Sequence, residues 1–260
     1  MKTSYVHTLL QLLHADIKIL LRGVVDNIIN TIIWASTVIG VAAYLMPKFG
    51  LQEDYAYFVL ATLCSSGGLF QMFSGASSLV SDFENNRLIN FYLTLPMPAP
   101  LVWLRFMLSF ALDSASVMLF IFPIGCLVLK GDFPFHQVNI LSYMLIFVLI
   151  SLFCGSFTLW MTSYIKEIRE IRTAWTRFVY PLWFLGCFQF SWQVLYSWSP
   201  TLAYLNLCNP MTYLAEGMRA ALLNSANSLN FWFCAAMIIL FTFICMIHAY
   251  YRLKIRLDFV

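Results

Sequence analysis

The sequence predicts an all-α membrane protein with six transmembrane helices and both termini in the cytoplasm. Hydrophobic residues make up 61% of the 260 residues and charged residues only 10%, whereas soluble domains carry about 25% charged residues. The apolar residues gather in long runs, and about 20 of them are enough to cross a bilayer as a helix. The basic residues gather in alternate links between these runs, which indicates the orientation.

The segment before the first long apolar run has the pattern of an amphipathic helix. Within residues 4–22, apolar side chains recur at helical spacing, as at Val6, Leu9 and Leu13. Lys18 and Arg22 lie on another face of the same helix. We expect this segment to be a separate helix in the membrane interface.

Six apolar runs are long enough to span a bilayer, and the links between them are too short to separate domains. We therefore expect residues 1–260 to form a single transmembrane domain. The predicted spans are residues 28–46, 55–79, 101–129, 138–165, 173–195 and 230–251.

The distribution of lysine and arginine predicts the orientation of these spans. With both termini inside, only Lys48, Lys130 and Arg219 of the 15 basic residues face outward. This asymmetry follows the positive-inside rule and indicates a multi-pass protein of the cytoplasmic (inner) membrane. It places residues 81–98 on the cytoplasmic side, together with the charged loop 166–172.

Residues 81–95 form the most polar break between the apolar runs, and they predict a short cytoplasmic helix. Ser81 followed by Glu84 matches a capping box, which marks a helix start. The apolar residues that follow are at helical spacing: Leu88, Ile89 and Tyr92. Two interpretations stay open, a docking surface for a partner or a turn that lies on lipid headgroups.

The link between the last two spans is long, apolar and predicted to contain two short outer helices. Ser199 and Asn209 each precede a proline, as N-cap residues do before a proline at the first helical position. We expect short re-entrant helices over about residues 200–207 and 210–223, within a cap at 200–223. Glu216 and Arg219 are spaced i, i+3 on the second helix and should pair.

The order of these features resembles the membrane (permease) subunit of type-2 ABC exporters. Besides the N-terminal helix, the polar run from Glu84 to Asn90 before Leu95-Pro96 is similar to the family's loop after the second span. The run 184–188 (FLGCF) is similar to a Gly-Gly-x-Phe stretch, although Cys187 replaces the second glycine. Asn209-Pro210 with Arg219 downstream resembles the family's Asn-Pro element.

The resemblance implies a permease that another chain drives. Such subunits form homodimers or pair with a paralogous permease. Each permease subunit of the pair binds one of two copies of an ABC ATPase subunit. The implied ATPase-coupling residues, with Glu84 and Arg87 as polar contacts, are Glu84, Arg87, Leu88, Ile89 and Tyr92. The chain has no G-x-x-x-x-G-K-[ST] loop, so ATP and Mg²⁺ are expected on the partner, with no cofactor or enzyme activity in this chain.

The implied activity is export of an amphiphilic substrate, a lipid, a drug-like compound or a glycan, and no nucleic acid is expected as a partner. The residues considered for a substrate path are polar or aromatic: Asn27, Asn30, Phe70, Phe73, Asp113, Arg177, Trp183, Phe184 and Phe188. Lipid-facing aromatic residues and ordinary helix contacts are the alternative. Asp113 stands out because a carboxylate in mid-membrane costs about 2.5–3.5 kcal/mol on insertion scales.

Two rival functions remain open at this point. Ser77 in the second span and His248 in the last span could form the nucleophile and base of an intramembrane serine protease. A channel or a passive scaffold is the other class. A selectivity filter would need repeated polar loops or rings of like charge, and the short outer helices are too apolar for that.

Overall fold

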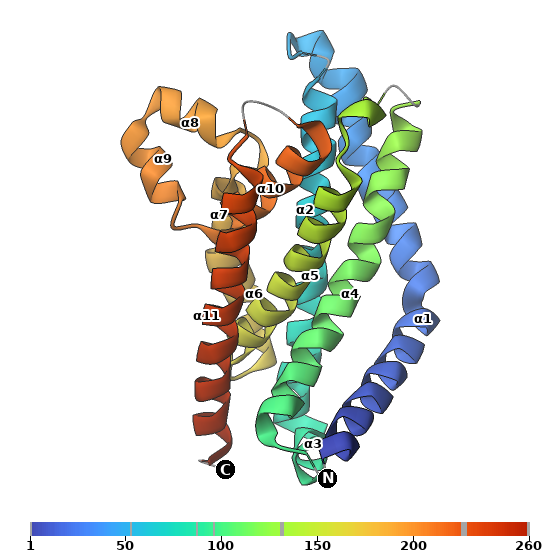
Figure 1. Ribbon diagram of the computed structural model, residues 1–260, viewed down its shortest axis with the longest axis vertical. Coiled ribbons are helices and arrows are strands. Elements are labelled where there is room, and N and C mark those ends of the chain that lie inside the picture. The colour runs from blue at the N-terminus through green and yellow to red at the C-terminus, as the bar shows by residue number, and fades with distance from the viewer. Residues whose placement is uncertain are drawn as a thin grey trace.

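The computed structural model is a bundle of long helices that run side by side (Figure 1). It describes residues 2–52, 54–86, 88–95, 97–130, 133–224 and 228–258. The structure is 88% helix, and the described residues contain no strand. The all-α prediction is therefore confirmed.

Five long helices make up the bundle, and shorter helical pieces join them. The long helices are α1 (Lys2–Gly40), α2 (Tyr55–Ser81), α4 (Ala99–Val128), α5 (Ile140–Thr162) and α11 (Phe231–Asp258). The shorter pieces are η1 (Val41–Leu45), η2 (Met46–Phe49), η3 (Asp82–Asn86), α3 (Leu88–Thr94), η4 (Phe135–Gln137), α6 (Ile168–Ala174), η5 (Trp175–Val179), α7 (Tyr180–Trp183), η6 (Phe184–Phe188), α8 (Trp192–Trp198), α9 (Pro200–Asn206) and α10 (Pro210–Leu223).

Five helical stretches of the described chain are long and apolar enough to cross a membrane. They are Tyr5–Phe49, Tyr55–Glu84, Ala99–Val128, Ile140–Thr162 and Phe231–Arg256. These stretches fit a membrane-embedded, multi-pass protein. They contain the first, second, third, fourth and sixth predicted spans, in whole or in large part.

The predicted separate N-terminal helix is wrong. The segment 4–22 is the first half of α1, which continues without a break into the first predicted span. Gly23 is the weakest helix former at the expected junction, and one internal glycine costs a helix only about 1 kcal/mol. The junction therefore stays helical.

The fifth predicted span, residues 173–195, is not one regular helix. Helical structure begins earlier, at Ile168, and runs through α6, η5, α7 and η6 to Phe188. Two π-helical segments interrupt the α-helical hydrogen bonding in this stretch. Beyond it, α8 and α9 form a helical hairpin at one end of the bundle (Figure 1).

Among the five long helices α2 is the most buried, and small residues let the helices of the bundle approach closely. Ser114 of α4 donates a hydrogen bond to the carbonyl of Gly68, with Oγ and O 3.2 Å apart. At Gly155 of α5, an added Cβ would lie 2.2 Å from the carbonyl oxygen of Met107, so only glycine fits there. The serine- and glycine-rich face around Gly68 on α2 therefore packs inside the chain.

The two ends of the bundle differ. The first turns of α1, the last turns of α11 and α3 lie together at one end (Figure 1). The α8–α9 hairpin lies toward the opposite end. The two short helices predicted after Ser199 and Asn209 are confirmed as α9 and α10.

Candidate functional site

The turn between α2 and α4 is held by a carboxylate, though not by the predicted capping box. The helix does not begin at Ser81, because α2 runs through Ser81 into η3. Instead, Asp82 Oδ2 accepts a hydrogen bond from the backbone N–H of Ile89 at 2.9 Å. This bond satisfies one of the free N–H groups at the start of α3.

Glu84 ties this turn to a second link of the bundle. Its Oε1 accepts a hydrogen bond from the backbone N–H of Ile168, the first residue of α6, at 3.0 Å. The capping box of this region lies there, between Glu167 and Glu170. Glu84, which comes from a different element of the chain, therefore supplies a further hydrogen-bond acceptor at the N-terminus of α6. Negative charge is favourable at this position.

The end of α11 completes the same assembly. The guanidinium of Arg256 lies 4.2 Å from the ring centroid of Phe83 in η3. It also donates to the carbonyls of Thr162 and Ile165, at 3.2 and 2.8 Å. The α2–α4 turn, the α5–α6 link and α11 are thus joined at one end of the bundle.

The predicted docking residues do not all face outward. Glu84 is exposed, but Ile89 is only 2% exposed and packs in a cluster with Val102 and Trp103. The ring of Tyr92 lies 4.4 Å from the guanidinium of Arg105. Ile89 is therefore part of the chain's own core, which corrects its expected role as a partner contact.

A further residue of the turn points outward instead. Phe91 is 58% exposed, and the prediction omitted it although it lies at i+3 from Leu88, on the same helix face as Leu88 and Tyr92. Its signal was a large aromatic side chain in a short polar segment. Arg87 and the side chain of Leu88 lie outside the described part of the structure.

The helix that begins at Ile168 ends in a backbone break at the FLGCF run. Gly186 leaves helical geometry with ψ at 36°, and Cys187 has φ at 59°. A Cβ on Gly186 would lie 2.4 Å from Cβ of Met211 on α10. Glycine is therefore required at 186 by close packing, whereas Cys187 adopts the left-handed conformation despite its side chain.

Polar side chains near the Asn-Pro element satisfy the carbonyls that this break exposes. Asn209 Nδ2 donates to the carbonyl of Leu182 at 2.7 Å, while its Oδ1 caps α10. Asn206 Nδ2 donates to the carbonyl of Leu185 at 2.8 Å. Without these donors the broken helix would leave buried carbonyls unpaired, which is costly.

The predicted pairing of Glu216 and Arg219 is confirmed. The two atoms Oε1 and Nη1 are 3.0 Å apart, and the side chains are only 0% and 3% exposed. Arg219 also donates to the carbonyls of Cys187 and Phe190. Glu216 accepts the backbone N–H of Trp192 at 2.8 Å, so the ion pair fixes the chain on both sides of the break.

The predicted aromatic residues come together beside this broken helix. Phe70 of α2 lies between Trp34 of α1 and Trp183, with ring centroids 4.8 and 5.8 Å apart. Trp183 also contacts Phe184 and Phe188 at 4.7 and 4.3 Å.

An open groove of about 550 Å³ lies over this cluster. It is lined by Phe70, Thr176, Tyr180, Pro181, Trp183 and Phe184. Phe73 lies outside it and packs on Trp175 at 5.4 Å. Its lining is mostly apolar and aromatic, as in many binding sites for small organic molecules.

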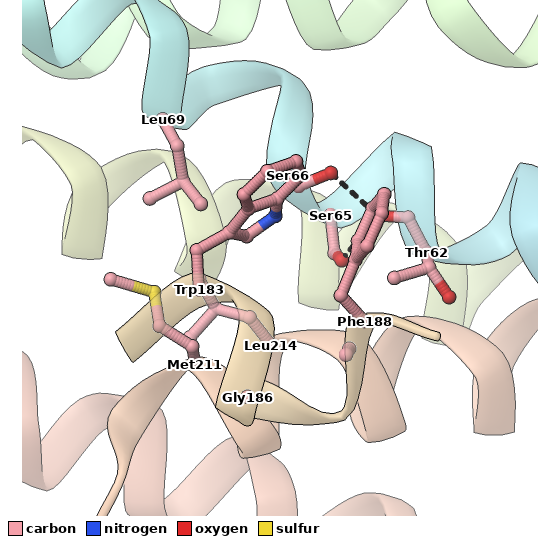
Figure 2. Close-up of a pocket in the computed structure, with 10 residues that line it drawn as sticks. Thr62, Ser65, Ser66, Leu69, Trp183, Gly186, Phe188, Met211 and Leu214 are labelled. Atoms are coloured by element: carbon pink, nitrogen blue, oxygen red, sulfur yellow. Dashed lines mark hydrogen bonds between the residues drawn. The ribbon is translucent and has the colours of Figure 1, made fainter. Parts of the chain in front are cut away.

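A small cavity lies on the inner side of the same cluster. Figure 2 shows Trp183 and Phe188 of the broken helix facing Thr62, Ser65 and Ser66 of α2. Both serine hydroxyls donate to the backbone carbonyl of Thr62. The volume is only about 10 Å³, about the size of one water molecule, so a substrate does not fit there.

The polar residues considered for the path lie elsewhere. Asn27 is half-buried and Asn30 exposed on α1, and Arg177 is exposed on η5. Asp113 of α4 lines a different groove, together with Asp16. The structure therefore brings four of the predicted path residues into one cluster: Phe70, Trp183, Phe184 and Phe188. It leaves Asn27, Asn30, Asp113 and Arg177 outside this cluster.

The two residues considered for a protease have separate partners. Ser77 Oγ donates to the carbonyl of Phe73 in its own helix at 2.7 Å. His248 Nδ1 accepts a hydrogen bond from Trp160 Nε1 at 2.8 Å, and Tyr164 lies within hydrogen-bonding distance of the same ring. This arrangement gives no support to a serine–histidine pair.

Comparison with known proteins adds no relative. No protein-family model matches the chain, and a search of the curated proteins found no match.

Proposed function

We propose that this chain is the membrane-spanning subunit of an ATP-driven exporter, powered by a separate ATPase that docks on the α2–α4 turn. The substrate is an amphiphile that leaves the cytoplasm or the inner leaflet. The permease works as a dimer with a second copy of itself or a paralogue, in the cytoplasmic (inner) membrane. The order of the sequence motifs supports this proposal.

The observation that carries the proposal is the continuous stretch from Ile168 to Phe188. Its first residue is held by Glu84 of the turn, and its last turns carry Trp183 and Phe184, which line the aromatic groove. A movement of the turn would therefore be transmitted along this stretch to the groove. This is the mechanical connection that a permease without its own ATP site needs.

The broken end of the same stretch supplies a hinge for such a movement. Cys187 has a positive φ and Gly186 leaves helical geometry, while Glu216 and Arg219 hold the far side of the break. Discontinuous helices of this kind line the substrate sites of many transporters. In this proposal the α6–η6 stretch moves against the fixed α10.

Co-expression with a candidate nucleotide-loop ATPase from the same genome tests the proposal. Phe91→Asp should abolish co-purification and the stimulation of ATP hydrolysis by the permease, because it places a charge in the docking surface. Trp198→Asp is the matched control, since Trp198 is an exposed aromatic residue on α8, toward the opposite end of the bundle. Retained co-purification with Phe91→Asp would refute the docking site, and the absence of any ATPase complex would favour a channel or scaffold.

A further inference from the structure

A polar groove lies between α1, α2 and α4, apart from the aromatic cluster. It has a volume of about 360 Å³, and α1 and α4 run side by side along it (Figure 1). Its polar lining residues are Asp16, Ser74, Ser78, Asp82, Arg105, Ser109 and Asp113. Apart from Asp82, which also holds the α2–α4 turn, these side chains have no role in the docking turn or the aromatic groove.

The groove is built by two polar stripes with helical spacing. On α2 and its continuation η3 the stripe is Ser74, Ser78 and Asp82, and each residue follows the last by four positions. On α4 it is Arg105, Ser109 and Asp113, again at i, i+4 and i+8. Residues at this spacing share one helix face, so both helices turn a polar face to the same groove.

A buried ion pair forms one wall. Arg105 Nη2 donates to Asp16 Oδ1, and the two side chains are only 8% and 9% exposed. The rings of Tyr92 and Phe106 cover the guanidinium, with their centroids 4.4 and 4.8 Å away. This pair joins α1 to α4.

The pair is incompletely satisfied by the chain itself. Among the described residues, neither Asp16 Oδ2 nor Arg105 Nε has a hydrogen-bond partner, although both atoms are buried. Buried charged groups with unmade hydrogen bonds are strongly unfavourable. Asp16 Oδ2 therefore offers an acceptor, and Arg105 Nε offers a donor, to a bound molecule.

The charge balance indicates which molecule fits. Three carboxylates, Asp16, Asp82 and Asp113, line the groove against one guanidinium, Arg105. The formal excess of two negative charges favours a cation. Ile19 and Leu20 also line the groove, and Ile19 is 66% exposed, so an apolar tail can continue along α1.

We propose that this groove binds the head of an amphiphile that carries a protonated amine with a neighbouring oxygen. The ammonium lies between Asp113 and Asp16 Oδ2, the oxygen accepts from Arg105 Nε, and the tail follows Ile19. The chemistry is shared by an alkylated amino alcohol and by the ethanolamine headgroup of a membrane lipid. The site does not depend on docking of an ATPase.

Photoaffinity labelling of the full chain in phosphatidylcholine nanodiscs tests this site. The probe is a dodecyl amino alcohol with a diazirine in its tail, and the matched diol probe lacks only the charge. We expect the amine probe to label α1 near Ile19 and the diol to label it about tenfold less. Asp113→Asn should reduce labelling by the amine about tenfold, since it removes one partner of the ammonium.

Two further variants make the test decisive. Asp26→Asn removes an exposed carboxylate from α1 outside the groove and should leave labelling unchanged. Ser78→Trp fills the groove from its exposed edge without changing the charge, and it should abolish labelling. This variant tests the site independently, so the test still works if Asp113→Asn fails to fold. Equal labelling by amine and diol, or full labelling of folded Ser78→Trp, would overturn the proposal.

Competition then distinguishes the two sources of the amine. If nanodiscs of phosphatidylethanolamine suppress the labelling, the natural occupant is a lipid headgroup of the bilayer. If they do not, while an unlabelled alkylated amino alcohol does, the occupant is a separate amphiphile. Suppression by neither compound would show that labelling is not due to the groove and would overturn the proposal.

Discussion

Glu84 and Ile168 are 84 positions apart, yet the carboxylate of the first accepts a hydrogen bond from the backbone N–H of the second at 3.0 Å. This contact joins the turn after α2 to the start of the helical stretch that ends in the aromatic groove. It gives the proposed docking turn a direct mechanical connection to the proposed substrate path.

Glu84→Ala should loosen the N-terminus of α6 without unfolding the bundle. A hydrogen bond from a backbone N–H to an exposed carboxylate contributes about 1 kcal/mol, so amide exchange at Ile168 should accelerate about fivefold. Hydrogen–deuterium exchange with mass spectrometry measures this rate. Glu84→Gln keeps an acceptor oxygen and should retain most of the protection; equal exchange in Glu84→Ala and the wild type would show that the contact does not stabilise α6.

The two roles of Asn209 should make its replacement unusually costly. Asn209→Ala loses the N-cap of α10 and the bond to the Leu182 carbonyl, for an expected total of about 2–4 kcal/mol. Asn139→Ala is the matched control, because exposed Asn139 only caps α5 through the Ser142 N–H, and it should cost about 1 kcal/mol. Denaturant unfolding in detergent compares them, and equal losses would contradict the role at the broken helix.

The buried pair on α10 should tolerate neutralisation of Glu216 better than loss of Arg219. Arg219→Met leaves the Glu216 carboxylate buried without its cation, and removing one partner of a buried pair costs about 3–5 kcal/mol. Glu216→Gln keeps an acceptor for the Trp192 N–H and should cost less. Thermal unfolding of both variants measures the order, and a milder effect of Arg219→Met would contradict it.

Gly186 should not accept a methyl group. An added Cβ would lie 2.4 Å from Cβ of Met211, and such overpacking costs about 1–3 kcal/mol. Gly23→Ala is the control, since nothing lies within 4 Å of a Cβ there, and it should stabilise α1 by about 0.5–1 kcal/mol. Unfolding measurements that ranked the two variants equally would refute the close contact between η6 and α10.

Local patterns predicted the parts of the fold that local energies decide. Long apolar runs and the prolines after Ser199 and Asn209 located most of the long helices and the two short helices α9 and α10. The capping box at Ser81 failed because a cap contributes only about 1 kcal/mol, and the side chain of Glu84 bonds to Ile168 instead. The continuity of α1 through Gly23 was missed for a similar reason, since one weak position does not end a long helix.

The candidate site was only partly predictable, because periodicity shows that a face is apolar and not what covers it. Ile89 follows the pattern of a docking face, but Val102 and Trp103 of the same chain cover it. Phe91 fits the same spacing, at i+3 from Leu88, yet it is exposed. The break at Cys187 depends on donors from Asn206, Asn209 and Arg219, all from later in the chain, so no local signal placed it at that residue.

The central claim, that a separate ATPase engages the α2–α4 turn, is tested most directly by crosslinking from position 91. A photoreactive benzoylphenylalanine replaces Phe91 in one variant and Trp198 in another, and each is irradiated in membranes that contain the co-expressed ATPase. We predict a crosslink to the ATPase from position 91 and none from position 198. Labelling from 198 alone, or from neither position in a purified complex that contains the ATPase, would contradict the claim.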